Sequence, residues 1–113
     1  MKKYFTFFYL RNQNIIAMFK RTIINTFVSE ADCDMFIMVL RQQWPSFLKD
    51  FDGVSLEICK DINFPNRMLA LWTLSEKTQL EKIENLGAEI IIPYRDRLSP
   101  KTSTYDFQVH NEI

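Results

Sequence analysis

The chain has 113 residues, the size of a single domain with one hydrophobic core. Its fourteen basic and fourteen acidic residues cancel, so the composition shows no excess of positive charge that would indicate binding to nucleic acid or to an anionic membrane surface. The aromatic share of 14%, with ten phenylalanines, is high, and these rings require a core, a partner subunit or a ligand to cover them.

The sequence carries few groups that could hold a metal or act as nucleophiles. Cys33 and Cys59 are too few for a disulfide framework and are interpreted as structural thiols in a reducing compartment. One histidine, with no CxxC or HExxH pattern, leaves metal binding unsupported, and neither a phosphate-binding glycine loop nor a catalytic triad is recognisable. We therefore predict no metal and no cofactor. No apolar run approaches the about 20 residues of a membrane span and no credible signal peptide is present, so the expected location is cytoplasmic.

The first half of the chain predicts a strand followed by a helix. Residues 1–14 are an aromatic-rich extension to which the sequence assigns no role. β-Branched residues cluster from 15 to 25 and predict the first strand. Ser29 predicts a helix start, because its hydroxyl can accept a hydrogen bond from a free backbone N–H. Apolar residues at helical spacing continue from 35 to 51, and Pro45 predicts a kink or restart.

A β-hairpin follows at the centre of the chain. Asp52-Gly53 predicts a turn into a half-exposed strand over 54–61, and a loop over 62–66 leads to the strand 67–74. That last strand is apolar on both faces, with Met68, Ala70, Trp72 and Leu74 on one side and Leu69, Leu71 and Thr73 on the other. Neither face should meet water, which predicts a dimer or a closed cavity.

The remaining elements complete a recognisable order. Ser75 predicts the cap of a second helix, and Gly87 predicts its end or a break. Residues 88–92 fit either helix or strand, 94–98 fit a helical turn, and 102–110 alternate as a last strand. The order β-α-β-β-α-β is typical of the ferredoxin-like α+β fold, in which a four-stranded antiparallel sheet carries its helices on one face.

The residues of the central hairpin resemble a known family. Phe51-Asp52-Gly53 opening a strand, and Leu69-Ala70-Leu71-Trp72-Thr73 leading into Ser75-Glu76-Lys77, look like the antibiotic biosynthesis monooxygenase family. The resemblance would make residues 15–113 one domain of the dimeric α+β barrel type. It implies a homodimer whose sheets pack face to face, with a pocket for a small apolar or aromatic molecule between sheet and helices.

The resemblance also implies an activity, cofactor-independent oxidation of an aromatic or quinol substrate beside Trp72. Suitable helpers are Asn25, Tyr94, Arg95 and Tyr105, which offer hydrogen bonds and one positive charge near a developing oxyanion. We take Trp72, Asn25, Tyr94 and Arg95 as the candidate catalytic residues. The alternative is a non-catalytic dimer of the same fold that binds a small ligand. The haem-degrading branch fits poorly, because its iron ligand is a histidine on the second helix, and residues 76–98 contain none; the only histidine is His110.

Overall fold

A computed structural model describes residues 18–113 of the chain. The extension over residues 1–14 and the first residues of the predicted strand over 15–25 lie outside this described part. The described elements are, in order, β1 (Phe19–Thr26), α1 (Glu30–Leu48), β2 (Val54–Lys60), β3 (Arg67–Leu74), α2 (Thr78–Ile90), α3 (Ile92–Leu98) and β4 (Lys101–Gln108). The predicted order is thus observed, with the short helix α3 added before the last strand.

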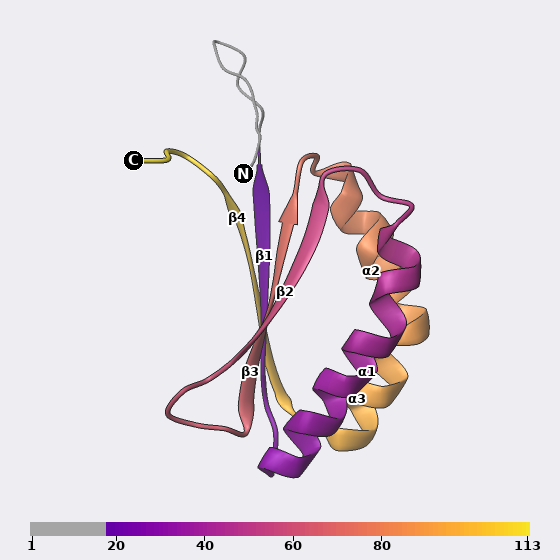
Figure 1. Cartoon of the computed structure of the whole chain (residues 1–113), viewed down its shortest axis with the longest axis vertical. Helices are drawn as coiled ribbons and strands as arrows, with labels where there is room; N and C mark the ends of the chain where they lie inside the picture. Colours follow the sequence, from indigo (N-terminus) through magenta and orange to yellow (C-terminus); the bar gives the residue numbers. More distant parts are fainter. Residues whose placement is uncertain (1–17) are drawn as a thin grey trace.

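The four strands form one antiparallel sheet in the order β2-β3-β1-β4. Figure 1 shows the sheet as one layer and all three helices together as a second layer against one face. The α+β ferredoxin-like prediction is therefore confirmed. The two central strands, β1 and β3, run directly beneath the helices, and this arrangement fixes where a buried site can form.

Strand β3 supplies the centre of the core. Met68, Ala70, Trp72 and Leu74 share one face, as their alternation predicts, and the structure buries that face beneath the helices. Leu69, Leu71 and Thr73, on the other face of the strand, are half-buried. The sheet therefore has one face closed by its own helices and a second face that the described part of the chain leaves partly open.

Helix α1 begins where the sequence predicts. The Ser29 hydroxyl accepts a hydrogen bond from the backbone N–H of Asp32 at 3.1 Å. The helix then continues through Pro45, so the predicted restart is wrong. Pro45 and Arg41 are exposed, so water can satisfy the Arg41 carbonyl that loses its helical partner. The apolar stripe is also shorter than predicted, because Met35 is exposed and the helix ends before Phe51.

The start of α2 differs from the prediction. Ser75 does not cap this helix, which begins at Thr78 after a residue with no capping side chain. Gln79 takes over that role from inside the helix: its Oε1 accepts from the backbone N–H groups of Ser75 and Glu76, both at 3.1 Å. Its Nε2 donates to the carbonyl of Asp52 at 2.7 Å. One buried amide therefore ties the helix start to the turn that opens β2.

Gly87 neither ends nor breaks α2, because the helix runs on to Ile90 and α3 follows directly. The residues left ambiguous by the sequence, 88–92, are thus helical apart from Ile91 between the two helices. A Cβ placed on Gly87 would meet Trp44 at 3.8 Å. The glycine sits where α2 passes a tryptophan of α1, and the helical hydrogen bonds on either side outweigh its low propensity.

Candidate functional site

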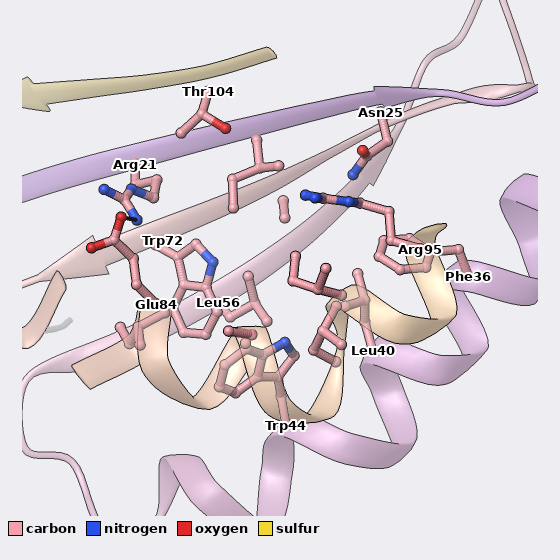
Figure 2. A pocket seen from close by; sticks show the side chains of 17 residues that line it. Arg21, Asn25, Phe36, Leu40, Trp44, Leu56, Trp72, Glu84, Arg95 and Thr104 are labelled. Carbon is pink, nitrogen blue, oxygen red and sulfur yellow. Dashed lines mark ion pairs between the residues drawn. The ribbon is translucent and has the colours of Figure 1, made fainter. Parts of the chain in front are cut away.

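A cavity of about 410 Å³ lies between the sheet and the helices, beside Trp72 (Figure 2). This volume falls within the usual range of small-molecule pockets. Its walls come from the helix-facing sides of all four strands and from all three helices, and they are mainly apolar. The residues that line it are Arg21, Ile23, Asn25, Phe36, Leu40, Trp44, Leu56, Ala70, Trp72, Ile83, Glu84, Gly87, Ala88, Ile91, Ile92, Arg95 and Thr104.

Small side chains explain why the core leaves room at this place. Ala70 lies at the middle of β3, paired with Ile23 of β1 on one side and Ile58 of β2 on the other. Its side chain stops at Cβ, so the floor of the cavity is lower there than at Met68 or Trp72. Above it, α2 presents Gly87 and Ala88 to the same space. The sheet and the helix are thus held apart by their larger neighbours and cannot close over these positions.

Two tryptophans form one aromatic wall of the cavity. The rings of Trp44 on α1 and Trp72 on β3 meet edge to face, with centroids 4.7 Å apart and planes at 82°. Trp72 is 2% exposed and Trp44 is 4% exposed. This contact geometry is favourable for aromatic pairs and fixes the orientation of both rings. A flat ligand in the cavity would meet an indole surface that is already held in place.

Arg21 is buried and closes one end of the cavity with an ion-pair cluster whose two carboxylates are partly exposed. Its Nε and Nη2 donate to the two carboxylate oxygens of Asp106 at 2.6 and 2.9 Å, and its Nη1 lies 3.2 Å from Glu84. Asp106 comes from the neighbouring strand β4, and Glu84 comes from α2 above the sheet. The guanidinium hydrogen bonds hold the pKa of the Asp106 carboxyl below its usual range. The cluster therefore ties sheet and helix together at this end.

Asn25 lies near the opposite end of β1 and is 1% exposed. Its Oδ1 accepts a hydrogen bond from the hydroxyl of Thr102 on β4 at 2.5 Å. Its Nδ2 lies 3.8 Å from the sulfur of Met68, the residue paired with it on β3. Thr102 thus fixes the amide plane, and the amide donor faces the cavity side of the sheet.

Arg95 reaches the same end of the cavity from α3. Figure 2 shows its guanidinium directed into the cavity, towards Asn25. Of the four candidate catalytic residues, the structure therefore brings three together at one cavity, namely Asn25, Trp72 and Arg95. Tyr94 is 40% exposed and does not line the cavity. Tyr105 is 54% exposed on the opposite face of the sheet, and neither tyrosine is placed to act in this cavity.

Arg21 and Glu84 line the cavity and Thr102 binds Asn25 beside it, but none of the three was among the predicted site residues. A signal for Arg21 existed, since it alternates with Phe19 and Ile23 on the face of β1 that turns to the helices. A charged side chain on a buried strand face must find partners. Glu84 and Thr102 gave no comparable signal, because each lies among other polar residues on the surface of its own element.

The Arg21–Asp106 pair predicts a dependence of stability on pH. Since the pKa of Asp106 is lowered on folding, its ionised form stabilises the fold above the ordinary carboxyl pKa of about 4. That contribution is lost as the pH falls through the lowered, folded-state pKa. Asp106→Asn should therefore unfold at a lower temperature at pH 7, and the gap to the wild type should narrow below about pH 4. Thermal unfolding followed by circular dichroism at several pH values measures this, and a gap that is constant with pH would contradict it.

A substitution that fills the floor of the cavity should weaken ligand binding without destabilising the fold. Ala70→Leu adds three carbon atoms that point into the open space, so we expect unchanged or slightly higher thermal stability. Any small aromatic ligand of the cavity should bind about tenfold more weakly or worse, because its volume is taken. Isothermal titration of both proteins with the same ligand tests this. Equal affinity in the variant would place the ligand outside the cavity.

Two further features of residues 18–113 bear on the class of site. None of the helices in this part is both long and apolar enough to cross a membrane. Within the same residues, no group of three or more His, Cys, Asp or Glu side chains is placed to hold a metal ion. His110 lies beyond β4 and is exposed, so it does not contribute to the cavity.

Comparison with solved structures places the architecture among dimeric ferredoxin-like proteins. One such protein from an uncultured marine organism is 20% identical over 86% of this chain and 91% of its own, with a TM-score of 0.69. A protein from Deinococcus radiodurans, proposed to be an antibiotic biosynthesis monooxygenase, is 12% identical over 85% and 95%, also with a TM-score of 0.69. A mutant of a cofactor-independent oxygenase from Streptomyces nogalater is 11% identical over 88% and 98%, with a TM-score of 0.58.

These likenesses confirm the fold that the central hairpin led us to expect, that of the antibiotic biosynthesis monooxygenases and related dimeric ferredoxin-like proteins. No family model matches the sequence, and no curated protein matches it. At these identities the likeness concerns the fold. The activity has to be argued from the cavity of this chain.

Proposed function

We propose that this protein is a cofactor-independent monooxygenase that oxidises an aromatic or quinol small molecule in the cavity beside Trp72. The observation that carries the proposal is the cavity itself, about 410 Å³ in volume, with an aromatic wall and two hydrogen-bond donors at one end. The similarity in fold to a cofactor-independent oxygenase supports it. Site, activity and substrate class together form one hypothesis that oxygen consumption can test.

The reaction proposed needs little from the protein. An electron-rich substrate with a benzylic CH₂ beside a phenol or ketone loses a proton to form a delocalised anion. The anion transfers electrons to O₂, one oxygen atom bonds to the carbon, and the O–O bond breaks. CH₂ plus O₂ thus becomes C=O plus H₂O, with O₂ as the oxidant and the substrate as the reductant. The step that a protein can promote is formation and orientation of the anion.

The cavity residues would divide this task. Arg95 and the Asn25 amide would stabilise the developing oxyanion, since a positive charge and a donor in a site with little water favour the ionised form. Trp72 would hold the flat ring, and its neighbour Trp44 would keep the indole in place. The apolar walls would exclude water from the anion. These roles make Asn25, Trp72 and Arg95 the proposed catalytic residues.

A homodimer forms part of the proposal. The face of the sheet turned away from the helices carries half-buried or exposed apolar side chains in the described chain, and a second copy would cover them. Those side chains are Ile24, Leu69, Leu71, Tyr105 and Phe107. The description of similar structures as dimeric supports this assembly. Light scattering at micromolar concentration should give twice the mass of the chain, and a monomer would contradict the dimer.

Oxygen uptake tests the activity. The protein, treated with a chelator and stripped of bound flavin, is mixed with a panel of anthrones and hydroquinones in an oxygen electrode. We expect uptake above the spontaneous rate with at least one substrate, with equal amounts of oxygen and substrate consumed and one oxygen atom retained in the product. No oxygen should return when catalase is added, because H₂O₂ would indicate simple two-electron oxidation. The absence of uptake with all of these substrates would contradict the monooxygenase and favour a non-catalytic module that binds a small ligand.

That second candidate is a non-catalytic module that binds a small aromatic ligand in the same cavity. One observation favours it: among the described residues that line the cavity, Glu84 is the only carboxylate, and it lies 3.2 Å from Arg21. With its carboxylate engaged by Arg21, Glu84 is not placed as a free general base, so the substrate would have to lose its proton to water or ionise before it binds. Ligand binding without oxygen uptake is the result that this candidate predicts.

A further inference from the structure

Two hydrogen-bond donors meet at the Asn25 end of the cavity, and residues 18–113 place no strong acceptor between them. The Nδ2 of Asn25 has the sulfur of Met68 as its partner, at 3.8 Å, and a thioether is a weak acceptor. The ion-pair partner found for Arg95 in the described chain is Asp96, at 3.9 Å and with its side chain 68% exposed. The Asn25 side chain is 1% exposed, and the cost of removing its N–H groups from water is offset only if an acceptor forms a hydrogen bond with them.

The other end of the cavity has the opposite electrical character. There Arg21 is shared by two carboxylates, Asp106 and Glu84, so the cluster carries one negative charge in excess. Arg21 and Asn25 lie on the same face of β1, four residues apart, which separates their Cα atoms by roughly 13 Å. The cavity is therefore polarised along the strand, positive at Arg95 and negative at Glu84.

From this polarity we infer that the cavity selects aromatic carboxylates. The carboxylate would sit on the Asn25 amide and the Arg95 guanidinium, with the ring extending along β1 towards Trp72. The negative end would disfavour the reversed orientation. A carboxylate can accept from both donors at once, whereas a neutral amide or ester offers one carbonyl oxygen and no charge. The inference deepens the proposed function by naming a substrate class for the same cavity, but binding can be measured without turnover.

The protein contains its own reporter for this test. Its only two tryptophans, Trp44 and Trp72, both line the cavity, so a change in intrinsic fluorescence reports on the cavity directly. We would titrate the protein with 2-naphthoate and with 2-naphthamide, which share a two-ring skeleton and differ in charge. Isothermal titration would give the same dissociation constants without optical interference. We expect the carboxylate to bind at least about tenfold more tightly than the amide.

Two arginines of α3 give a matched pair of variants. Arg95→Gln removes the cation from the cavity, while Arg97→Gln removes the same charge from the exposed side of the same helix, where Arg97 lies over the ring of Tyr94. Arg95→Gln should weaken 2-naphthoate about tenfold and leave 2-naphthamide within about twofold. Arg97→Gln should bind both as the wild type does. Thermal unfolding of the variants checks that α3 remains folded.

Several results would overturn the inference. Equal affinity of the wild type for both compounds would do so, as would a preference that survives in Arg95→Gln or is lost equally in Arg97→Gln. Absence of saturable binding by either compound would also refute it. The proposed function fails separately: selective carboxylate binding without oxygen uptake by any substrate would support the inference and reject the monooxygenase. Oxygen uptake with neutral quinols, together with equal binding of carboxylate and amide, would support the monooxygenase and reject the inference.

Discussion

Trp72→Phe should lower the rate of oxygen uptake by about tenfold or more, which corresponds to roughly 1.4 kcal/mol of lost transition-state stabilisation. The indole is 2% exposed, lines the cavity and meets Trp44 at 4.7 Å, so its loss removes both ring area and the contact that orients it. The phenyl ring fills less of the wall, and a substrate would bind in several orientations. Initial rates at saturating and at low substrate measure the effect on turnover and on binding separately.

A general loss of stability must be distinguished from a loss at the site. Phe47→Leu is a suitable control, because Phe47 packs partly buried against the same core but does not line the cavity. Both variants shrink one core aromatic, and we expect similar thermal destabilisation, below the roughly 3–5 kcal/mol of a full truncation to alanine. Oxygen uptake should fall only in Trp72→Phe. Undiminished uptake in that variant, with the oligomeric state unchanged, would remove Trp72 from the mechanism.

Gly53→Ala should be the most damaging single-methyl substitution in the fold. Gly53 has a φ of +71°, in the left-handed region that costs other residues about 1–2 kcal/mol. A Cβ there would also lie 2.5 Å from the Ser75 hydroxyl oxygen and 2.9 Å from its Cβ, so the turn into β2 would have to move away from the segment that joins β3 to α2. We expect a loss of about 2–3 kcal/mol in the free energy of unfolding. Urea unfolding at 25 °C measures it.

The second glycine provides the matched control. Gly87→Ala adds the same methyl group inside α2, where the backbone is helical and the nearest contact is an ordinary 3.8 Å from Trp44. Alanine is the better helix former, so this variant should gain about 0.5–1 kcal/mol. A loss in Gly87→Ala similar to that in Gly53→Ala would show that crowding around added methyl groups, rather than backbone conformation, dominates.

The sequence was sufficient to predict the order of elements, because each strand and helix carries its own periodicity. The alternation of residues 67–74 placed Met68, Ala70, Trp72 and Leu74 together on one face of β3, but both faces are apolar, so only the structure shows that the helices cover this one. The interruptions were harder to predict. Pro45 and Gly87 are local breakers by propensity, yet both lie within continuous helices because tertiary packing and solvent compensate for the hydrogen bond and entropy that each costs.

The candidate site was less predictable than the fold, because it depends on which strands are neighbours and in what register. Asn25 could be named as a polar residue late in β1, but its partner Thr102 lies 77 positions away and meets it only through the β1–β4 pairing. Arg21 and Asp106 are linked by the same register. Arg95 and Tyr94 are adjacent in the chain, and only the rotation of α3 distinguishes the residue at the cavity from the exposed one.

The edge strand β4 connects this cavity to the state of assembly. Every residue of β4 is exposed in the single chain, and the strand is held mainly by its ladder with β1 and by the Arg21–Asp106 pair. Such a strand opens locally at low free-energy cost, so its amides should exchange with solvent deuterium earlier than those of β3. Opening would also release Asn25 from Thr102 and free its amide to rotate. If a partner covers Tyr105 and Phe107, ligand affinity should rise with protein concentration, because subunit association and ligand binding both favour the closed strand.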